Sequence, residues 1–353
     1  MAGGGGTRLW PVSRASSPKQ AQPFGDNETL LQKTFHRLRR GWTAKDIFVS
    51  TSQEQYAVLH QQLPQLSRQH FILETARRET GPAIGLAAAF LHKKNPQEIM
   101  FTANSDAYLK EAQNYIRAIK QAGKVVAQNP DRTVLLGIKP RFAHTGLGYI
   151  KMKKQFAVMG GHEIFSVDRF VEKPNSATAK KYAASWQYLW NPAMFVFRVD
   201  AMLEKFRRWM PVSYRLLKQM EEAVGTSREQ STIKRLFPKM EKISIDYGIM
   251  EHDRNMLVIP TDLTWSDIGD WQAVHEMLAE HPQENLLRGR HVTIDSQGNL
   301  LFSYSGKLIA TAGLHNMIVI ESGDAILVCP KDRAQDVKKI VAELERQKLN
   351  RHL

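Results

Sequence analysis

The sequence has a single cysteine, Cys329, in 353 residues, so it offers neither an internal disulfide nor a cysteine-based zinc site. One thiol fits a reducing compartment, and we expect a cytoplasmic protein. No apolar run approaches the roughly 20 residues that span a bilayer, and no charged segment followed by an apolar stretch marks a signal peptide. These absences argue against secreted disulfide-rich proteins and against a membrane partner.

Acidic residues are the scarcer charge. The chain has 49 Lys and Arg against 35 Asp and Glu, a formal net charge of +14. Such a surplus favours anionic partners, among them phosphorylated small molecules and nucleic acid. The basic runs 37–40 and 151–154 lack the interleaved aromatics of a single-strand binder, and no nucleic-acid module is recognisable, so we expect no nucleic-acid partner.

Residues 1 to about 275 mix short apolar runs with helical patterns. Runs at 47–49, 98–101 and 134–138 predict buried strands, and apolar spacing from Tyr108 to Gln121 predicts a helix. Strands that alternate with helices favour an α/β domain with a mostly parallel sheet. Ligands of such sheets bind outside the carboxyl ends of the strands.

After about residue 285 the pattern changes to short apolar segments with a turn signal roughly every 7–10 residues. This spacing predicts hairpins or the coils of a small β-helix. A final helix is expected after Pro330, with Asp332 as its N-cap. We therefore divide the chain into residues 1–280, an α/β domain, and residues 285–353, a β-helix-like unit with a C-terminal helix.

The N-terminal segment has four consecutive glycines, Gly3, Gly4, Gly5 and Gly6, followed by Thr7. Glycines let several backbone N–H groups surround one anion, and Arg8, Arg14 and Lys19 add positive charge, so the segment suits a polyphosphate. It has neither the spacing of a Walker loop nor that of the dinucleotide fingerprint. The competing interpretation is an unstructured tail.

Two aspartates are candidate metal ligands. Asp106 and Asp267 each follow an apolar stretch and a small polar residue. A carboxylate pair at strand ends can hold Mg²⁺ and leave positions for phosphate oxygens, whereas zinc sites favour thiolate and imidazole. Either aspartate alone could equally be a turn residue.

Eight motifs resemble, in order, those of the sugar-1-phosphate nucleotidyltransferases. They are the glycine segment with Trp10–Arg14 and Pro18–Gln20, then segments 74–84, 105–106, 145–150, 170–174, 190–195, 244–247 and 265–271. The Trp-Pro-x-Ser-Arg form is similar to the mannose-1-phosphate guanylyltransferase branch. The resemblance implies a Rossmann-like fold of the nucleotide-diphospho-sugar transferase type, and it spans essentially the whole chain.

The resemblance also implies the reaction of GTP with mannose 1-phosphate to give GDP-mannose and diphosphate, assisted by Mg²⁺ on Asp106 and Asp267. Arg8 and Lys19 would be the catalytic cations. The implied nucleotide-binding residues are Gly3, Gly4, Gly5, Gly6, Thr7, Glu74, Arg78, Thr80 and Pro82. The implied sugar-phosphate residues are Gly146, Glu172, Lys173, Asn191 and Asp246.

The chain departs from the family pattern in places. The family has an apolar strand before the glycine loop, whereas this chain starts Met1-Ala2, so we expect an upstream native start or a fragment. Asn104, Ala107, Glu79, Gly81 and Pro192-Ala193 also differ from the pattern. Two alternatives therefore stay open: a nucleotidyltransferase for another sugar 1-phosphate, and a non-catalytic homologue that binds nucleotide-sugar. A homodimer is also left open.

Overall fold

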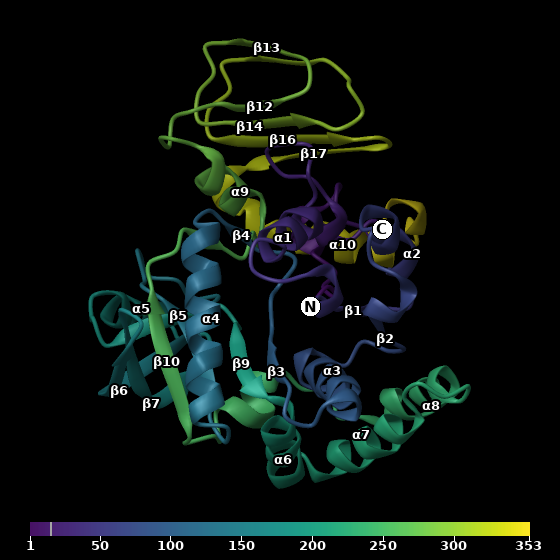
Figure 1. The fold of residues 1–353 in the computed structure, drawn as a ribbon. Helices are drawn as coiled ribbons and strands as arrows, with labels where there is room; N and C mark the ends of the chain where they lie inside the picture. The colour runs from purple at the N-terminus through teal and green to yellow at the C-terminus, as the bar shows by residue number, and fades with distance from the viewer. Residues whose placement is uncertain (15) are drawn as a thin grey trace.

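The computed structural model describes residues 1–14 and 16–353, and Ala15 lies outside the described residues. Figure 1 shows two parts: a large α/β portion, and a smaller stack of strands at the top formed by the C-terminal residues. The α/β class is confirmed.

A seven-stranded sheet forms the centre of the large part, in the order β10-β7-β6-β8-β5-β9-β3, with β10 also paired to β5. Its strands are β3 (Ile99–Phe101), β5 (Thr133–Ile138), β6 (Gly148–Met159), β7 (His162–Val171), β8 (Tyr188–Asn191), β9 (Phe195–Arg198) and β10 (Met256–Thr261). Two smaller pairs accompany it, β1 (Val49–Ser52) with β2 (Phe71–Glu74), and β4 (Tyr108–Leu109) with β11 (Trp265–Ser266).

The sheet is mixed rather than mostly parallel. β10–β5 and β1–β2 are parallel, whereas the other pairings of the central sheet are antiparallel. The sequence prediction missed this because the β6–β7 hairpin adds two antiparallel strands, and β8 and β9 pair antiparallel with strands that lie far from them in the chain. Strand periodicity says nothing about which strand becomes the neighbour.

Helices cover the sheet on both faces. The helices of this part are α1 (Leu30–Leu38), α2 (Tyr56–Gln62), α3 (Thr80–Lys94), α4 (Ala112–Gln128), α5 (Ser176–Ala183), α6 (Val199–Trp209), α7 (Pro211–Ala223), α8 (Glu229–Leu236) and α9 (Trp271–Leu278). Successive residues of β5 point to opposite faces, so Leu135 joins the core under α3 and α6, and Val134 and Leu136 join the core under α1 and α4. This alternation explains why the run at 134–138 is apolar throughout.

The C-terminal part is a short parallel β-helix closed by one hairpin. Its strands are β12 (Leu286–Arg288), β13 (His291–Ile294), β14 (Leu300–Ser303), β15 (Ile309–Ala312), β16 (Met317–Ser322) and β17 (Ala325–Pro330). β12, β14 and β16 stack in parallel, as do β13 and β15, and β17 returns antiparallel to β16. The turn spacing predicted either hairpins or the coils of a small β-helix, and the structure contains both.

Three local predictions were wrong. Residues 108–110 do not begin a helix, because β4 pairs with β11 and α4 starts only at Ala112. The strand expected at 47–49 lies two residues later, at β1. The last helix, α10 (Val337–Arg346), follows a 3₁₀ turn over 331–336, so Asp332 is not its N-cap.

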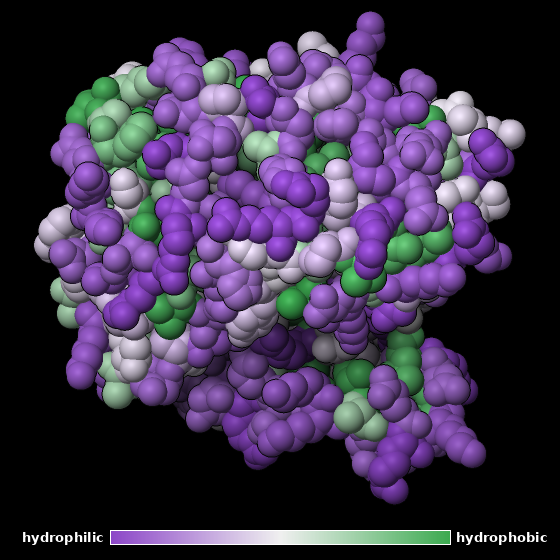
Figure 2. Space-filling model, turned by 90° about the horizontal axis from the view of Figure 1, so that it is seen from below, coloured by the Kyte–Doolittle hydropathy of each residue, from purple (hydrophilic) through white to green (hydrophobic). Residues whose placement is uncertain are grey.

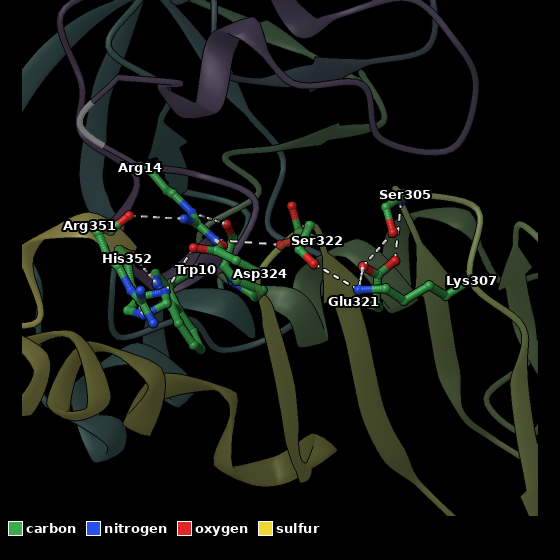
Figure 3. Close-up of polar contacts among 11 residues, drawn as sticks. Trp10, Arg14, Ser305, Lys307, Glu321, Ser322, Asp324, Arg351 and His352 are labelled. Atoms are coloured by element: carbon green, nitrogen blue, oxygen red, sulfur yellow. Dashed lines mark hydrogen bonds and ion pairs between the residues drawn. The ribbon is translucent and has the colours of Figure 1, made fainter.

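The chain ends attach the two parts to each other. Leu9, Trp10 and Val12 share one buried cluster with Phe302 and Val337. Arg14 forms an ion pair of 2.6 Å with Asp324, and the indole nitrogen of Trp10 donates to the carbonyl of His352 at 2.7 Å, as Figure 3 shows. The β-helix and the chain end thus buttress the segment that follows the four glycines.

Candidate active site

The glycine loop forms an open cradle of backbone donors. Gly3 to Gly5 are exposed, and within the described chain none of the N–H groups of Gly3–Gly6 donates to a protein acceptor. Gly6 has φ 59°, and a Cβ there would lie 2.5 Å from the Cβ of Lys19, so only glycine fits. Ser13 donates to the carbonyl of Gly5 at 3.0 Å and fixes the end of the loop. Four free N–H groups in one loop suit an anion.

Lys19 lies between the two predicted metal ligands. Its side chain is 7% exposed, and its Nζ donates to Asp106 Oδ2 at 3.0 Å and to the carbonyl of Asp267 at 2.5 Å. In the antiparallel β4–β11 ribbon, Tyr108 pairs with Ser266, which brings the two aspartates to the same end of the ribbon. Three residues far apart in sequence thus meet beside the glycine loop, where a Cβ on Gly4 would lie 3.7 Å from Asp106 Oδ2.

Arg8 reaches the same place. A Cβ on Gly269 would lie 3.5 Å from Arg8 Nη1 and 3.3 Å from Asp267 Oδ2, so this glycine leaves room between the two charges. Arg8 Nη1 donates to Gln335 Oε1 at 3.2 Å, and the Gln335 amide donates to Asp270, the N-cap of α9. The orientation of Arg8 therefore depends on a residue of the C-terminal part.

Arg14 has a different role from Arg8 and Lys19. Its guanidinium is bound by Asp324 and by the carbonyl of Pro11 at 2.9 Å, and its side chain is 15% exposed. Arg14 is thus paired with a carboxylate of the C-terminal part, whereas Lys19 is paired with Asp106 beside the glycine loop.

The segment 74–84, which is predicted to bind the nucleotide, begins at the end of β2 beside the glycine loop. Glu74 ends β2, is 8% exposed, and would lie 3.6 Å from a Cβ on Gly3. Burial raises the pKa of Glu74, although a hydrogen bond of 3.0 Å from Ser50 opposes the rise. A carboxyl group here is able to accept hydrogen bonds from a bound base.

The rest of that segment is anchored to the protein. Arg78 donates to the carbonyl of Pro238, whereas the hydroxyl of Thr80 accepts from the N–H of Ile245 at 3.0 Å. A Cβ on Gly81 would meet the carbonyl of Ile243 at 2.7 Å, and Pro82 is buried in the first turn of α3. Contacts of these residues with a nucleotide stay a prediction.

Glu172 and Lys173 lie at the end of β7, where the chain turns. Lys173 has φ 46° and its Nζ contacts Glu172 Oε1. Partial burial lowers the pKa of Lys173, but the contact with Glu172 outweighs it and the pKa is raised. Gly148 gives Glu172 its room, because a Cβ there would lie 2.5 Å from Glu172 Oε2.

Asp246 faces the same carboxylate. Asn191 Nδ2 donates to Asp246 Oδ1 at 2.9 Å. The side-chain Oδ1 of Asn191 accepts from the N–H of Ala193 at 3.0 Å. Burial, and next the negative charge of Glu172, raise the pKa of Asp246 to about 6. Two acids, an amide and a lysine therefore converge, a set suited to sugar hydroxyls and one phosphate.

The two clusters adjoin. The side-chain amide of Asn104 donates to the carbonyl of Pro192 at 3.1 Å, so the Asp106 turn touches the Asn191 turn. Gly146 lies in an exposed loop before β6, where its N–H donates to His144. The sequence resemblance therefore selected residues that mostly share one region, but it gave no role to Asp270 or Gln335. Asp270 belongs to the motif 265–271, and the signal for Gln335 was the polar run 331–336 near the chain end.

The visible surface is mostly polar. Figure 2 shows a mostly hydrophilic face with small, separate hydrophobic areas.

Within the described residues, no group of three or more His, Cys, Asp or Glu could hold a metal by itself. A metal at Asp106 and Asp267 would therefore take other ligands from substrate and water.

An α/β fold with a glycine cradle, paired aspartates and converging cations defines a nucleotidyltransferase. The family described as "Nucleotidyl transferase" matches residues 1–284, and the "MannoseP isomerase/GMP-like beta-helix domain" matches residues 289–344. The chain belongs to the nucleotidyl transferase family, among the mannose-1-phosphate guanylyltransferases.

Three relatives illustrate the match. "Mannose-1-phosphate guanylyltransferase 2" of Escherichia coli O157:H7 is 33% identical over 100% of this chain and 74% of the relative. The xanthan biosynthesis protein XanB of Xanthomonas campestris is 33% identical over 98% of this chain and 72% of its own. A crystal structure described as mannose-1-phosphate geranyltransferase from Thermus thermophilus superposes with a TM-score of 0.88, at 31% identity and 98% coverage of both chains.

Proposed function

We propose that this enzyme converts GTP and α-D-mannose 1-phosphate into GDP-mannose and diphosphate. The convergence of Lys19, Asp106 and Asp267 beside the free N–H groups of the glycine loop carries the proposal. The names of the full-length relatives support the choice of substrates.

The nucleotide would lie across the cradle. The N–H groups of Gly3–Gly6 would donate to the triphosphate oxygens, and Lys19 and Arg8 would balance the charge that builds up during transfer. Glu74, beside Gly3, would accept hydrogen bonds from the base. Thr7, Arg78, Thr80 and Pro82 remain candidates for further nucleotide contacts.

Asp106 and Asp267 are suited to Mg²⁺. Both are oxygen donors, both remain partly accessible, and the adjacent glycines, Gly4 and Gly269, leave space beside them. When bound, the metal would neutralise phosphate charge and align the triphosphate. Lys19 holds the Asp106 carboxylate in place.

The sugar phosphate would occupy the second cluster. Lys173 would bind its phosphate, and Glu172, Asn191 and Asp246 would bind the hydroxyls, with Gly146 at the rim. A phosphate oxygen then bonds to the α-phosphorus while the bond to the bridging oxygen of diphosphate breaks. The attacking oxygen is already ionised near pH 7, so no general base is needed, and positioning with charge neutralisation provides most of the rate.

The test is diphosphate release with Mg²⁺, across GTP, ATP, UTP and dTTP against mannose, glucose and N-acetylglucosamine 1-phosphates. We expect the GTP and mannose 1-phosphate pair to give the highest kcat/KM. A higher value for another pair would favour the alternative of a different nucleotidyltransferase. Binding of GDP-mannose without diphosphate release from any pair would show a non-catalytic homologue.

Location and assembly stay predictions. In residues 1–14 and 16–353 no helix has the length and apolarity to cross a bilayer. The cytoplasmic location, which the single thiol led us to expect, stays a prediction. The homodimer and the division of the chain at residues 280–285 also stay predictions.

A further inference from the structure

The two candidate metal ligands lie at one end of a very short ribbon. Asp106 precedes β4 and Asp267 follows β11, and each of these strands has two residues. Tyr108 pairs with Ser266 in antiparallel register, so both aspartates lie beyond the same end of the ribbon. A ladder this short has few hydrogen bonds of its own, and its register needs support from outside.

The turn that carries Asp267 has a strained backbone. Ile268 has φ 45°, a left-handed conformation that β-branched residues avoid. Its side chain is fully buried, and its N–H donates to Ser266 Oγ at 3.1 Å. Strain of this kind persists only where the surroundings fix the backbone. The position of Asp267 therefore depends on how firmly β11 is held.

At the opposite end of the ribbon a carboxylate fastens the two chains together. Glu111 Oε2 accepts from the N–H of Thr264, and Glu111 Oε1 accepts from the Thr264 hydroxyl, both at 2.7 Å. The N–H of Lys110 donates to the Thr264 carbonyl at 3.1 Å. Glu111 is also the residue before α4, so these bonds tie the ribbon to that helix.

The two bonds of Glu111 are charge-assisted. Partial burial raises the pKa of Glu111, but the hydrogen bonds from Thr264 outweigh it and the pKa is lowered. Such bonds are about twice as strong as those between neutral groups. The nearest alternative is weaker, because Arg141 Nη2 lies 3.4 Å from Thr264 Oγ1 and its side chain is exposed.

We propose that Glu111 is a positioning residue for the pair of aspartates. By fastening Thr264 it sets the register of the ribbon, and the register sets the separation of Asp106 and Asp267. Lys19 closes the other end of the ribbon, because its Nζ donates to the Asp106 carboxylate and to the Asp267 carbonyl. The inference rests on the proposed role of the two aspartates in holding Mg²⁺.

The test compares the parent chain with Glu111→Ala, Glu111→Gln and Asp46→Ala. Glutamine can keep both bonds, since its carbonyl can accept from the Thr264 N–H and its amide can donate to the Thr264 hydroxyl. Asp46 is the matched control outside the ribbon. Its carboxylate likewise accepts from the N–H of Thr43 at 2.9 Å and from the Thr43 hydroxyl at 2.7 Å.

Calorimetric titration measures the binding of GTP with Mg²⁺ and with EDTA, or of whichever nucleoside triphosphate the parent binds best. We expect Glu111→Ala to bind roughly tenfold more weakly than the parent in Mg²⁺, the usual effect of losing a hydrogen bond that orients a metal ligand. In EDTA it should bind as the parent does, because the glycine loop, Arg8 and Lys19 are unchanged. Glu111→Gln and Asp46→Ala should match the parent in both conditions.

Thr264→Val is a milder variant, which loses the hydroxyl bond and keeps the N–H bond. It should show a smaller loss of the same kind, and no loss would count against the inference even if Glu111→Ala fails to fold. Parental binding by Glu111→Ala in Mg²⁺ would overturn this inference alone. An equal loss in EDTA, or an equal loss in Glu111→Gln or Asp46→Ala, would also overturn it. A parent whose triphosphate binding gains nothing from Mg²⁺ would overturn the metal site, and this inference with it.

Discussion

The partly buried carboxyl of Asp246 predicts a loss of stability as the pH rises. Its pKa is raised from an ordinary 3.8 to about 6, chiefly by burial and next by Glu172. Between these values the folded protein keeps a proton that the unfolded chain releases, so the free energy of unfolding falls with increasing pH. Relative to strongly acidic pH, where both states hold the proton, the free energy of unfolding is lower by about 1 kcal/mol near pH 4.5 and by about 3 kcal/mol near pH 8.

The Asp246→Asn variant should escape this loss, because an amide does not ionise and its carbonyl can still accept from Asn191. The stability of the variant relative to the parent should therefore grow by about 2 kcal/mol from near pH 4.5 to near pH 8. Urea titrations followed by tryptophan fluorescence measure this difference without substrate. Asp332→Asn, at an exposed carboxylate, is the matched control and should show no such trend. Parallel pH profiles of parent and Asp246→Asn would refute the reasoning.

Two further predictions concern the cations of the glycine loop. Lys19→Ala should lower turnover by roughly 10²–10³, the usual cost of one preorganised charge-stabilising donor, and near-parental diphosphate release would remove Lys19 from the catalytic machinery. Gln335→Ala should release Arg8 and lower kcat by roughly tenfold, with the KM for mannose 1-phosphate unchanged. The lost hydrogen bond to Asp270 should also lower the unfolding midpoint. The control is Gln347→Ala, on the exposed surface of the same part. A change confined to KM or to stability would contradict a positioning role for Gln335.

Local sequence patterns predicted elements well where burial follows a simple period. The run at 134–138 is a strand because both its faces are covered, and the segments after residue 290 alternate with turns as β-helix coils do. The prediction failed at Tyr108–Leu109, where apolar spacing continues a helical pattern. These two residues pair with Trp265–Ser266, a contact that no local window contains.

The sequence by itself determined the family and the chemical character of the site. Four glycines allow an anion to approach the backbone closely, the candidate metal ligands are oxygens because the chain has no pair of thiols, and the surplus of cations suits phosphorylated substrates. Only the tertiary structure decided how these groups are used. Lys19 meets Asp106 across 87 positions, and Arg8 meets Gln335 across 327, whereas Arg14 is neutralised by Asp324. Residue types fix which bonds can form, but burial and long-range packing decide which charges are paired within the protein and which carboxyl keeps its proton.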